Sequence, residues 1–325
     1  MILVTGATGR IGNVLVKELV KKKYEVRILV RESSNLKSLE GINVDIAYGD
    51  VTKPETLNLA MKDIESVFHL AGKINISDQD KDGTYDINIQ GTKNIIQACI
   101  ESRVEELIYT SSIHAFLAPS DGSLITEKNQ LCIDSGEQRG VYDCSKAFAT
   151  KEILSANGKG LKTLILAPTG VVGPYDYRPS YFGLGMISSI KNDMKYTIDG
   201  AYDYVDVRDV VQGIVSAYEK QKFGEIYLLG GFKLEMKDYF EYLKEITKVK
   251  GKTIFLSRQL AILLGRIMLL FDKQSPITPY SVRTLDSNSN VDHSKATREL
   301  DYHPMNMKES IKDQYEWFKS NGYIS

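Results

Sequence analysis

A chain of 325 residues can bury a large core, either as one domain or as two unequal ones. Its 41 Lys and Arg residues balance 42 Asp and Glu residues, which excludes a protein drawn to nucleic acid or acidic lipid by its overall charge. With 42% hydrophobic and 26% charged residues, the composition is that of a soluble globular protein. The three cysteines and four histidines are scattered, so we expect no disulfide framework and no metal site, and we expect a reducing, cytoplasmic location.

Strand-like and helix-like segments alternate along the first 170 residues. The first strand-like segment begins at residue 2, so no signal peptide is expected. The alternation predicts an α/β fold with a doubly wound parallel sheet, with helices on both faces. After Pro168 the pattern loosens, which predicts a domain at residues 1–170 and a smaller, mainly helical lobe at 171–325 that crosses back into the sheet. Strands are expected at residues 2–4, 24–30, 44–50, 65–72, 105–112 and 161–168, and helices at 14–22, 54–64, 85–101 and 141–157.

The segment QLAILLGRIMLLF at residues 259–271 is the most apolar part of the C-terminal half. It is too short to span a bilayer, which needs about 20 apolar residues, and Arg266 interrupts it. We therefore expect no membrane span. A buried helix or a cap over a substrate pocket is favoured, and a helix that docks on a membrane surface is the alternative.

The segment TGATGRIG follows the first predicted strand directly and places Gly6, Gly9 and Gly12 between that strand and a helix. A pyrophosphate site needs a tight turn, a close backbone, and a helix N-terminus with free N–H groups. The spacing is G-x-x-G-x-x-G rather than the commoner G-x-G-x-x-G. Its position favours a dinucleotide-binding Rossmann site over a merely structural turn.

The end of the second predicted strand should lie beside the adenosine ribose of such a cofactor. An acid there would bind the ribose hydroxyls, whereas an arginine would accept a 2′-phosphate. Arg31 stands first and Glu32 follows it, so NADP is favoured and NAD remains the alternative. Asp50, at the end of the third strand, could bond the adenine amino group.

Eight segments together resemble the extended short-chain dehydrogenase/reductase family, which is the NAD-dependent epimerase/dehydratase superfamily. The run VRESSNLK after the second strand, and the C-terminal SPITPYSVRT and DHSKATRELDYHP, are most similar to its dihydroflavonol-reductase and 3β-hydroxysteroid-dehydrogenase branch. The eight segments, in the family's order, are TGATGRIG, GDVT, HLAG, DINIQGTKNI, YTSS, YDCSK, LAPTGVVGP and YVDVRDV.

The four-residue separation of Tyr142 and Lys146 places both on one face of a predicted helix. The resemblance implies that Ser112, at the end of the fifth strand, completes a catalytic trio with them. Ser112 would hydrogen-bond the substrate oxygen, and Tyr142 would exchange a proton with it. Lys146 would hold the nicotinamide ribose and, with the nicotinamide charge, would lower the pKa of Tyr142 from about 10. The residues implied for cofactor binding are Gly6, Thr8, Gly9, Arg10, Ile11, Gly12, Arg31, Asp50, Val51, Leu70, Ala71, Gly72, Asn88, Thr110, Tyr142, Lys146 and Pro168.

Several positions depart from family patterns or stay ambiguous. Ile113 and His114 stand where sugar dehydratases carry an Asp-Glu pair, which argues against water loss. Phe116 and Leu117 depart from the epimerase and flavonoid-reductase patterns. His114 is expected to line a loop, with a contact to a substrate carbonyl as the alternative. Asp206 and Arg208 would form a structural ion pair or would face substrate.

The first functional hypothesis is a reductase of a ketone or aldehyde, or a dehydrogenase of a secondary alcohol, that takes NADP(H) and acts on a small, hydrophobic molecule. A nucleotide-sugar 4-epimerase that retains NAD is the alternative, and a nucleotide-binding regulator without turnover is the third reading. The family resemblance also implies a homodimer through the helices at 85–101 and 141–157. The apolar residues available for such an interface are Ile95, Ile96, Ile100, Phe148 and Ile153.

Overall fold

The structure is a computed structural model, and it describes most of the chain. The residues that it describes are 1–76, 80–133, 140–192, 196–248, 253–271, 278–285, 287 and 289–324.

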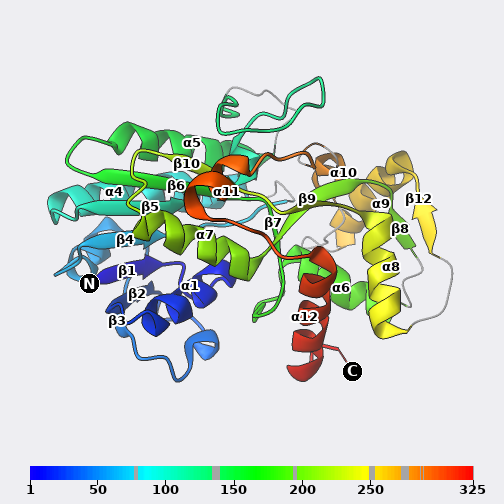
Figure 1. The fold of residues 1–325 in the computed structure, drawn as a ribbon, viewed down its shortest axis with the longest axis horizontal. Coiled ribbons are helices and arrows are strands. Elements are labelled where there is room, and N and C mark those ends of the chain that lie inside the picture. Colours follow the sequence, from blue (N-terminus) through cyan, green and yellow to red (C-terminus); the bar gives the residue numbers. More distant parts are fainter. Residues whose placement is uncertain are drawn as a thin grey trace.

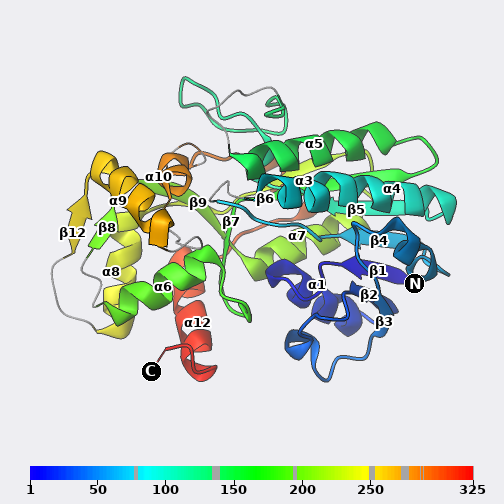
Figure 2. The same ribbon diagram turned by 180° about the vertical axis from the view of Figure 1, so that it is seen from behind.

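A seven-stranded parallel sheet forms the centre of the molecule, with strand order β10-β6-β5-β4-β1-β2-β3 (Figure 1). Every neighbouring pair is parallel, and the order reverses between β1 and β4. In both ribbon views α4 and α5 lie on one side of this sheet, and α1 and α7 lie on the other (Figures 1 and 2). The predicted α/β class is confirmed. The strands are β1 (Ile2–Thr5), β2 (Val26–Val30), β3 (Asp45–Tyr48), β4 (Ser66–His69), β5 (Glu106–Thr110), β6 (Lys162–Pro168) and β10 (Ile226–Leu229), and the four helices are α1 (Arg10–Lys21), α4 (Gly91–Glu101), α5 (Val141–Ala156) and α7 (Val207–Glu219).

The inner strands are largely apolar because helices cover both faces of the sheet, whereas the edge strand β3 is mostly exposed. Successive side chains of β1 point to opposite faces, so Leu3 and Val4 join different hydrophobic clusters. Both side chains are fully buried. This two-sided burial explains why the strands could be predicted from short apolar segments.

The helix predicted at residues 85–101 is divided into three parts. A short helix, α3 (Lys81–Tyr85), leads into a π-helical turn, η3 (Asp86–Gln90), and α4 begins at Gly91. The helix predicted at 54–64 is also shorter, with a 3-10 turn, η2 (Pro54–Thr56), before α2 (Leu57–Ala60). Apolar periodicity indicates a helix in both places but does not indicate where the hydrogen-bond pattern changes.

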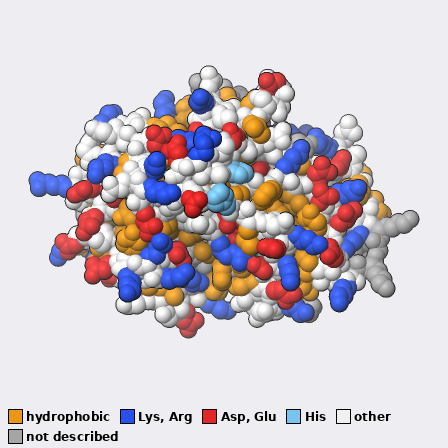
Figure 3. Space-filling model, in the orientation of Figure 1, with side chains coloured by type: hydrophobic (Ala, Val, Ile, Leu, Met, Phe, Trp, Pro, Cys, Tyr) orange, Lys and Arg blue, Asp and Glu red, His pale blue; other side chains and the backbone are white. Residues whose placement is uncertain are grey.

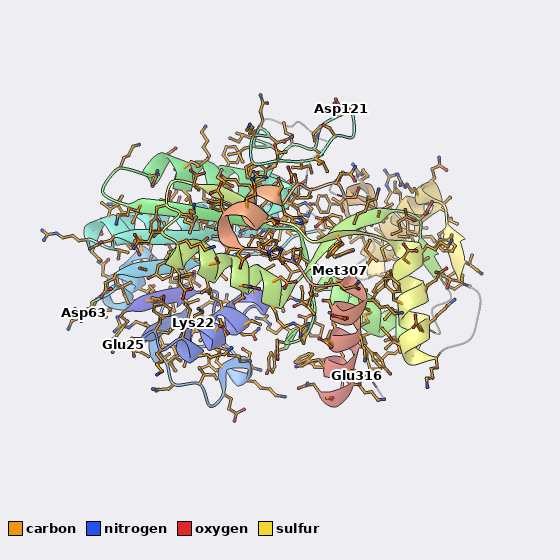
Figure 4. All side chains as sticks on the ribbon, viewed as in Figure 1. Lys22, Glu25, Asp63, Asp121, Met307 and Glu316 are labelled. Atoms are coloured by element: carbon orange, nitrogen blue, oxygen red, sulfur yellow. The ribbon has the colours of Figure 1, made fainter. Side chains whose placement is uncertain are left out.

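The chain after β6 forms a second group of elements and returns once to the main sheet through β10. Its own hydrophobic cluster includes Tyr239, Leu243 and Phe318. On α12, Met307 is buried and Glu316 is exposed, and Figure 4 labels both residues. The additional strands are β7 (Gly170–Val172), β8 (Tyr196–Ile198), β9 (Ala201–Asp206), β11 (Phe232–Glu235) and β12 (Ile254–Leu256), and the helices are α6 (Tyr181–Lys191), α8 (Met236–Thr247), α9 (Arg258–Phe271), α10 (Pro279–Thr284), α11 (Ser294–Leu300) and α12 (Met307–Ser320).

The prediction of a buried helix at residues 259–271 is wrong. The segment is helical as α9, but its buried residues are only Ala261 and Gly265. Large side chains such as Leu263 and Phe271 are exposed. Among the described residues, no helix is both long and apolar enough to cross a bilayer.

Candidate functional site

The residues predicted for cofactor and catalysis gather at the carboxyl ends of adjacent parallel strands. Gly6 follows β1, Leu70 follows β4, Ser112 lies two residues after β5, and Pro168 ends β6. β1 and β4 pair directly, and β4 is followed by β5 and β6 in the sheet. Ligands of open α/β sheets bind at this edge, where the strand order reverses.

The glycine loop joins β1 to α1 in a conformation that other residues could not adopt. Gly6 has a φ of 69°, and a Cβ atom on Gly12 would lie 2.1 Å from the Gly6 carbonyl oxygen. Gly9 is the N-cap of α1 and makes no side-chain cap hydrogen bond. Thr8 is half-buried and Gly9 is exposed. The backbone N–H groups of Arg10, Ile11 and Gly12 therefore form the first turn of a helix whose positive end is open to an anion.

The Arg10 side chain binds protein groups that lie far along the sequence. Its guanidinium donates to Asp176 Oδ2 at 2.7 Å, to Ser180 Oγ at 2.6 Å and to the Gly173 carbonyl oxygen at 2.7 Å. Asn13 also donates to the Tyr175 carbonyl oxygen at 3.2 Å. These bonds fasten the loop before α6 onto α1, so any contribution of Arg10 to a phosphate comes from its backbone N–H.

The predicted adenosine end is open and polar. Arg31 and Glu32 are both exposed immediately after β2. Asp50 Oδ1 accepts from the Thr52 N–H at 2.9 Å and from the Thr52 hydroxyl at 2.8 Å, which fixes the carboxylate at the end of β3. Val51 is buried, and its carbonyl oxygen accepts from the Asn94 side chain at 2.8 Å.

The proposed catalytic trio comes together from β5 and α5. The Ser112 hydroxyl acts on the Tyr142 phenol and lowers its pKa. Lys146 Nζ donates to the Thr110 carbonyl oxygen at 2.8 Å and to the Tyr109 hydroxyl at 3.2 Å, and it lies over the Tyr109 ring. Ser112, Tyr142 and Lys146 are 6%, 8% and 5% exposed, so all three polar groups are buried.

Burial dominates the electrostatics of this trio. It raises the pKa of Tyr142 to about 12, although Ser112 opposes it. It lowers the pKa of Lys146 to about 7. The sequence led us to expect a lowered pKa for Tyr142, whereas the protein's own groups raise it. The reason is that the loss of water around the phenol outweighs the neighbouring polar groups.

The Asn88 side chain hydrogen-bonds both the segment after β4 and helix α5. Its side-chain oxygen accepts from the Lys73 N–H at 2.7 Å, and its amide donates to the Lys73 carbonyl oxygen at 3.0 Å and to Ser145 Oγ at 2.8 Å. Asn88 lies in the π-helical turn, which aims its side chain at this strand end. A Cβ atom on Gly72 would lie 3.6 Å from Lys146 Nζ.

The remaining predicted residues line the same edge of the sheet. The Ala71 N–H donates to Thr5 Oγ1 at 3.2 Å, and the Leu70 N–H donates to the Thr5 carbonyl oxygen at 3.2 Å. Thr110 Oγ1 is buried without a hydrogen-bond partner among the described groups. Pro168 pairs with Leu229 of β10.

His114 is the centre of a hydrogen-bond network that the sequence did not reveal. Its Nδ1 lies 2.8 Å from Asp143 Oδ1 and 3.0 Å from the Tyr280 hydroxyl, and its Nε2 lies 2.8 Å from the Tyr202 hydroxyl. Tyr280 also donates to Asp143. The His114 ring packs edge-on against the Tyr142 ring, with centroids 5.5 Å apart. His114 does more than line a loop, because its ring connects β9 and α10 to α5.

Asp206 and Arg208 form a structural ion pair. Asp206 is fully buried as the N-cap of α7, and it accepts from Arg208 Nε at 2.9 Å. Arg208 also pairs with Asp313 of α12 at 2.8 Å. Of the two predicted roles for Asp206 and Arg208, the structure shows the ion pair.

A single family model matches residues 2–230 of the chain, and its description is the NAD dependent epimerase/dehydratase family. Sterol demethylase protein B of Methylococcus capsulatus is 30% identical over 99% of this chain and 99% of its own length. A putative dihydroflavonol 4-reductase of Synechocystis is 27% identical over 99% of this chain and 95% of its own length. A 3β-hydroxysteroid dehydrogenase is also among the relatives. The crystal structure of gox2253 superimposes with a TM-score of 0.87 at 29% identity, covering 100% of this chain and 99% of that one. The resemblance drawn from the sequence is confirmed.

Proposed function

Because the chain belongs to the NAD dependent epimerase/dehydratase family and is an oxidoreductase, we propose that it reduces a ketone or aldehyde, or oxidises a secondary alcohol, with NADP(H). The observation that carries this proposal is the burial of Ser112, Tyr142 and Lys146 beside the carboxyl end of β5, where Ser112 acts on the Tyr142 phenol and Lys146 bonds the Thr110 carbonyl oxygen. In this proposal Ser112 and Tyr142 bind the carbonyl oxygen of the substrate.

The residues at the sheet edge fit a nicotinamide dinucleotide. The glycine loop leaves no room for a Cβ at Gly12, and the uncapped N-terminus of α1 suits a pyrophosphate. Asp50 would hold the adenosine end, and Lys146 would hold the nicotinamide ribose. The bound cofactor would supply or accept the hydride.

The protein's own groups favour carbonyl reduction over alcohol oxidation. Reduction needs a phenol that donates a proton to the new alkoxide, and burial keeps Tyr142 protonated up to about pH 12. Oxidation needs the phenolate, which the same burial disfavours. Ser112 would orient the substrate oxygen toward the phenol and would share the charge that develops on it.

NADP is the proposed form of the cofactor. Arg31 is exposed at the position where a 2′-phosphate would lie, and its guanidinium can bind two phosphate oxygens at once. Glu32, the next residue, would repel that phosphate if it faced the ribose. Their order along the chain places the arginine nearer the strand end.

The proposed substrate is a hydrophobic carbonyl compound. The names of two relatives refer to a sterol and to a dihydroflavonol, which are both largely apolar ring systems. Tyr142 lies beside aromatic side chains, since the His114 ring contacts it and Tyr202 stacks on His114. Flat aromatic surfaces of this kind suit an apolar ring better than a charged sugar phosphate.

A homodimer through α4 and α5 is also proposed. Ile95 and Ile153 cannot contribute, because both are fully buried in the core beneath these helices. Ile100 and Leu154 are each 39% exposed and remain available for the interface. The expected apolar surface is therefore smaller than the sequence indicated.

The test follows the near-ultraviolet absorbance of the freshly purified protein through gel filtration, and then adds NADPH with a panel of hydrophobic ketones and aldehydes. A protein that emerges without nicotinamide and then oxidises NADPH with a carbonyl compound supports the reductase. A nicotinamide signal that stays with the protein and does not exchange with NADPH would indicate a 4-epimerase. Binding of NADPH without turnover on any compound would favour a regulator.

A further inference from the structure

The large apolar side chains of helix α9 face the solvent, and its small residues face the protein. Ala261 and Gly265 are its buried residues. At 100° per residue these two lie on one side of the helix, and the exposed apolar residues cover an arc of roughly 160° on the other. An ordinary surface helix has the reverse arrangement. The exposed residues are Leu260 43%, Leu263 53%, Leu264 37%, Ile267 45%, Met268 39%, Leu270 81% and Phe271 86%.

The strand before α9 extends this apolar surface. Ile254 and Phe255 of β12 are 53% and 45% exposed. β12 pairs with β8, where Tyr196 lies opposite Ile254 and is 59% exposed. Figures 1 and 2 place β12 and α9 at the end of the molecule that lies away from β1, β2 and β3. We call Tyr196, β12 and the exposed face of α9 the apolar end.

The segment that forms β12 and α9 is locally basic, although Glu245 and Asp272 flank it in the sequence. Residues 246–271 contain five basic residues and no acidic one. Lys248, Arg258 and Arg266 are exposed. The whole chain has a net charge of −1, so this positive segment is a local feature.

We propose that the apolar end docks on the surface of a bilayer that contains anionic lipid, with α9 lying in the plane of the interface. A helix of 14 residues is about 21 Å long and does not span a membrane, but it can bury one apolar face among the acyl chains. The exposed Lys248, Arg258 and Arg266 give this end of the molecule a positive charge that would attract anionic lipid. A convex helix with large outward side chains suits a fluid surface better than a shaped pocket.

A second copy of the chain fits this surface poorly. In a two-fold dimer the same patch meets itself, which would oppose two segments with five basic residues each. Like charges brought together in an apolar interface are costly, whereas anionic lipid neutralises them. The charge pattern therefore selects the bilayer over self-association.

The apolar end is connected to the candidate site through α10. Tyr280 of α10 hydrogen-bonds His114 and Asp143 beside the proposed catalytic tyrosine. Docking would hold this side of the molecule near the bilayer, where an apolar substrate partitions. The docking itself does not depend on the proposed reaction.

The test is co-sedimentation with vesicles of phosphatidylcholine and phosphatidylglycerol, compared with vesicles of phosphatidylcholine alone. The full chain should sediment with the anionic vesicles, and high salt should weaken its binding. The double variant Leu263→Ser/Ile267→Ser should bind at least about tenfold more weakly, because it removes apolar area from the docking face. Leu59→Ser is the matched control, since Leu59 is 85% exposed on α2, and it should bind like the wild type.

Three results would overturn the docking proposal. The first is a full chain that stays in the supernatant with both kinds of vesicle. The second is a double variant that binds as tightly as the Leu59→Ser control. The third is a double variant that changes the oligomeric state in gel filtration without vesicles, which would show that a second copy covers the face. Circular dichroism of both variants verifies that each is folded, and all of these readouts are independent of catalytic turnover.

Discussion

Burial acts on the two titratable side chains of the proposed trio in opposite directions. It raises the pKa of the Tyr142 phenol to about 12 and lowers the pKa of the Lys146 ammonium to about 7. Both changes favour the neutral form of the side chain. Near neutral pH the phenol therefore keeps its proton, while the lysine is divided between its charged and neutral forms.

The pH dependence of carbonyl reduction should follow Lys146. Its charged form is present below a pH of about 7 and is lost above that value, so kcat/KM should fall as the pH rises through about 7. Steady-state rates from pH 5.5 to 9 (roughly the range in which such a group titrates) measure this limb. Lys146→Arg keeps a positive charge throughout and should remove the limb, even if the rate is lower. An unchanged limb in that variant would assign the titration to another group.

Arg31 should determine the choice between the two dinucleotides. Arg31→Ala removes the proposed partner of the 2′-phosphate, so the KM for NADPH should rise about tenfold or more while the KM for NADH stays nearly constant. Glu32→Ala is the control at the adjacent exposed position, and it should not raise the KM for NADPH. Equal losses for both cofactors in Arg31→Ala would show that the arginine does not contact the phosphate.

The role of His114 could not be derived from the sequence. Asp143 and Tyr280 lie 29 and 166 residues away from it, and no local sequence pattern predicts their contacts with His114. The spacing of Tyr142 and Lys146 predicts only that both lie on one face of a helix, and the family resemblance implied their catalytic role. The only local feature that set residue 114 apart in the sequence was its histidine, which stands where sugar dehydratases carry an acidic residue.

The strands could be predicted from the sequence more reliably than the sides of the helices that pack against the protein. A parallel strand buried on both sides is mainly apolar, which residues 2–4 and 164–168 illustrate. For α9 the sequence indicates an amphipathic helix but not which side meets the protein. Ala261 and Gly265 pack inward because small residues allow close approach, and this leaves the leucines outside.

The contact between α1 and the loop before α6 should stabilise the fold strongly. Arg10 and Asp176 are paired at 2.7 Å with side chains that are 11% and 1% exposed. Asp176→Asn leaves the buried guanidinium charge without its partner, so the free energy of unfolding should fall by about 3 kcal/mol. Urea denaturation of the wild type and the variant at pH 7 gives this difference.

Glu245→Gln is the matched control for that variant. Glu245 pairs with Lys308 at 2.6 Å, but its side chain is 64% exposed, so neutralising it should cost less than about 1 kcal/mol. A loss for Asp176→Asn no larger than that of the control would mean that the buried pair contributes little. It would also mean that other bonds hold the loop on α1.

At the scale of the whole molecule, charge is mixed over most of the surface. Figure 3 shows basic and acidic side chains interspersed over one face, as the near-zero net charge predicts. Sequence composition could therefore exclude a global electrostatic partner, but it could not reveal the local positive segment beside α9. The division of the chain at residue 170 and the cytoplasmic location stay predictions.

The proposed dimer depends on the exposed apolar residues of α4 and α5. Ile100→Glu adds a charge to the expected interface, so the molar mass from light scattering after gel filtration should fall from that of a dimer to that of a monomer. Ile74→Glu is a control on another part of the surface, since Ile74 is 56% exposed. A wild-type protein that is already monomeric would contradict the dimer.

The central claim is that Tyr142 is the proton donor of a nicotinamide-dependent reductase. The most direct measurement compares NADPH oxidation by the wild type and by Tyr142→Phe on a carbonyl substrate, with NADPH affinity measured on the same samples by fluorescence. We expect a loss in kcat of about a hundredfold to ten-thousandfold with an unchanged affinity for NADPH. A variant that turns over at the wild-type rate while binding NADPH equally well would contradict the assignment of Tyr142.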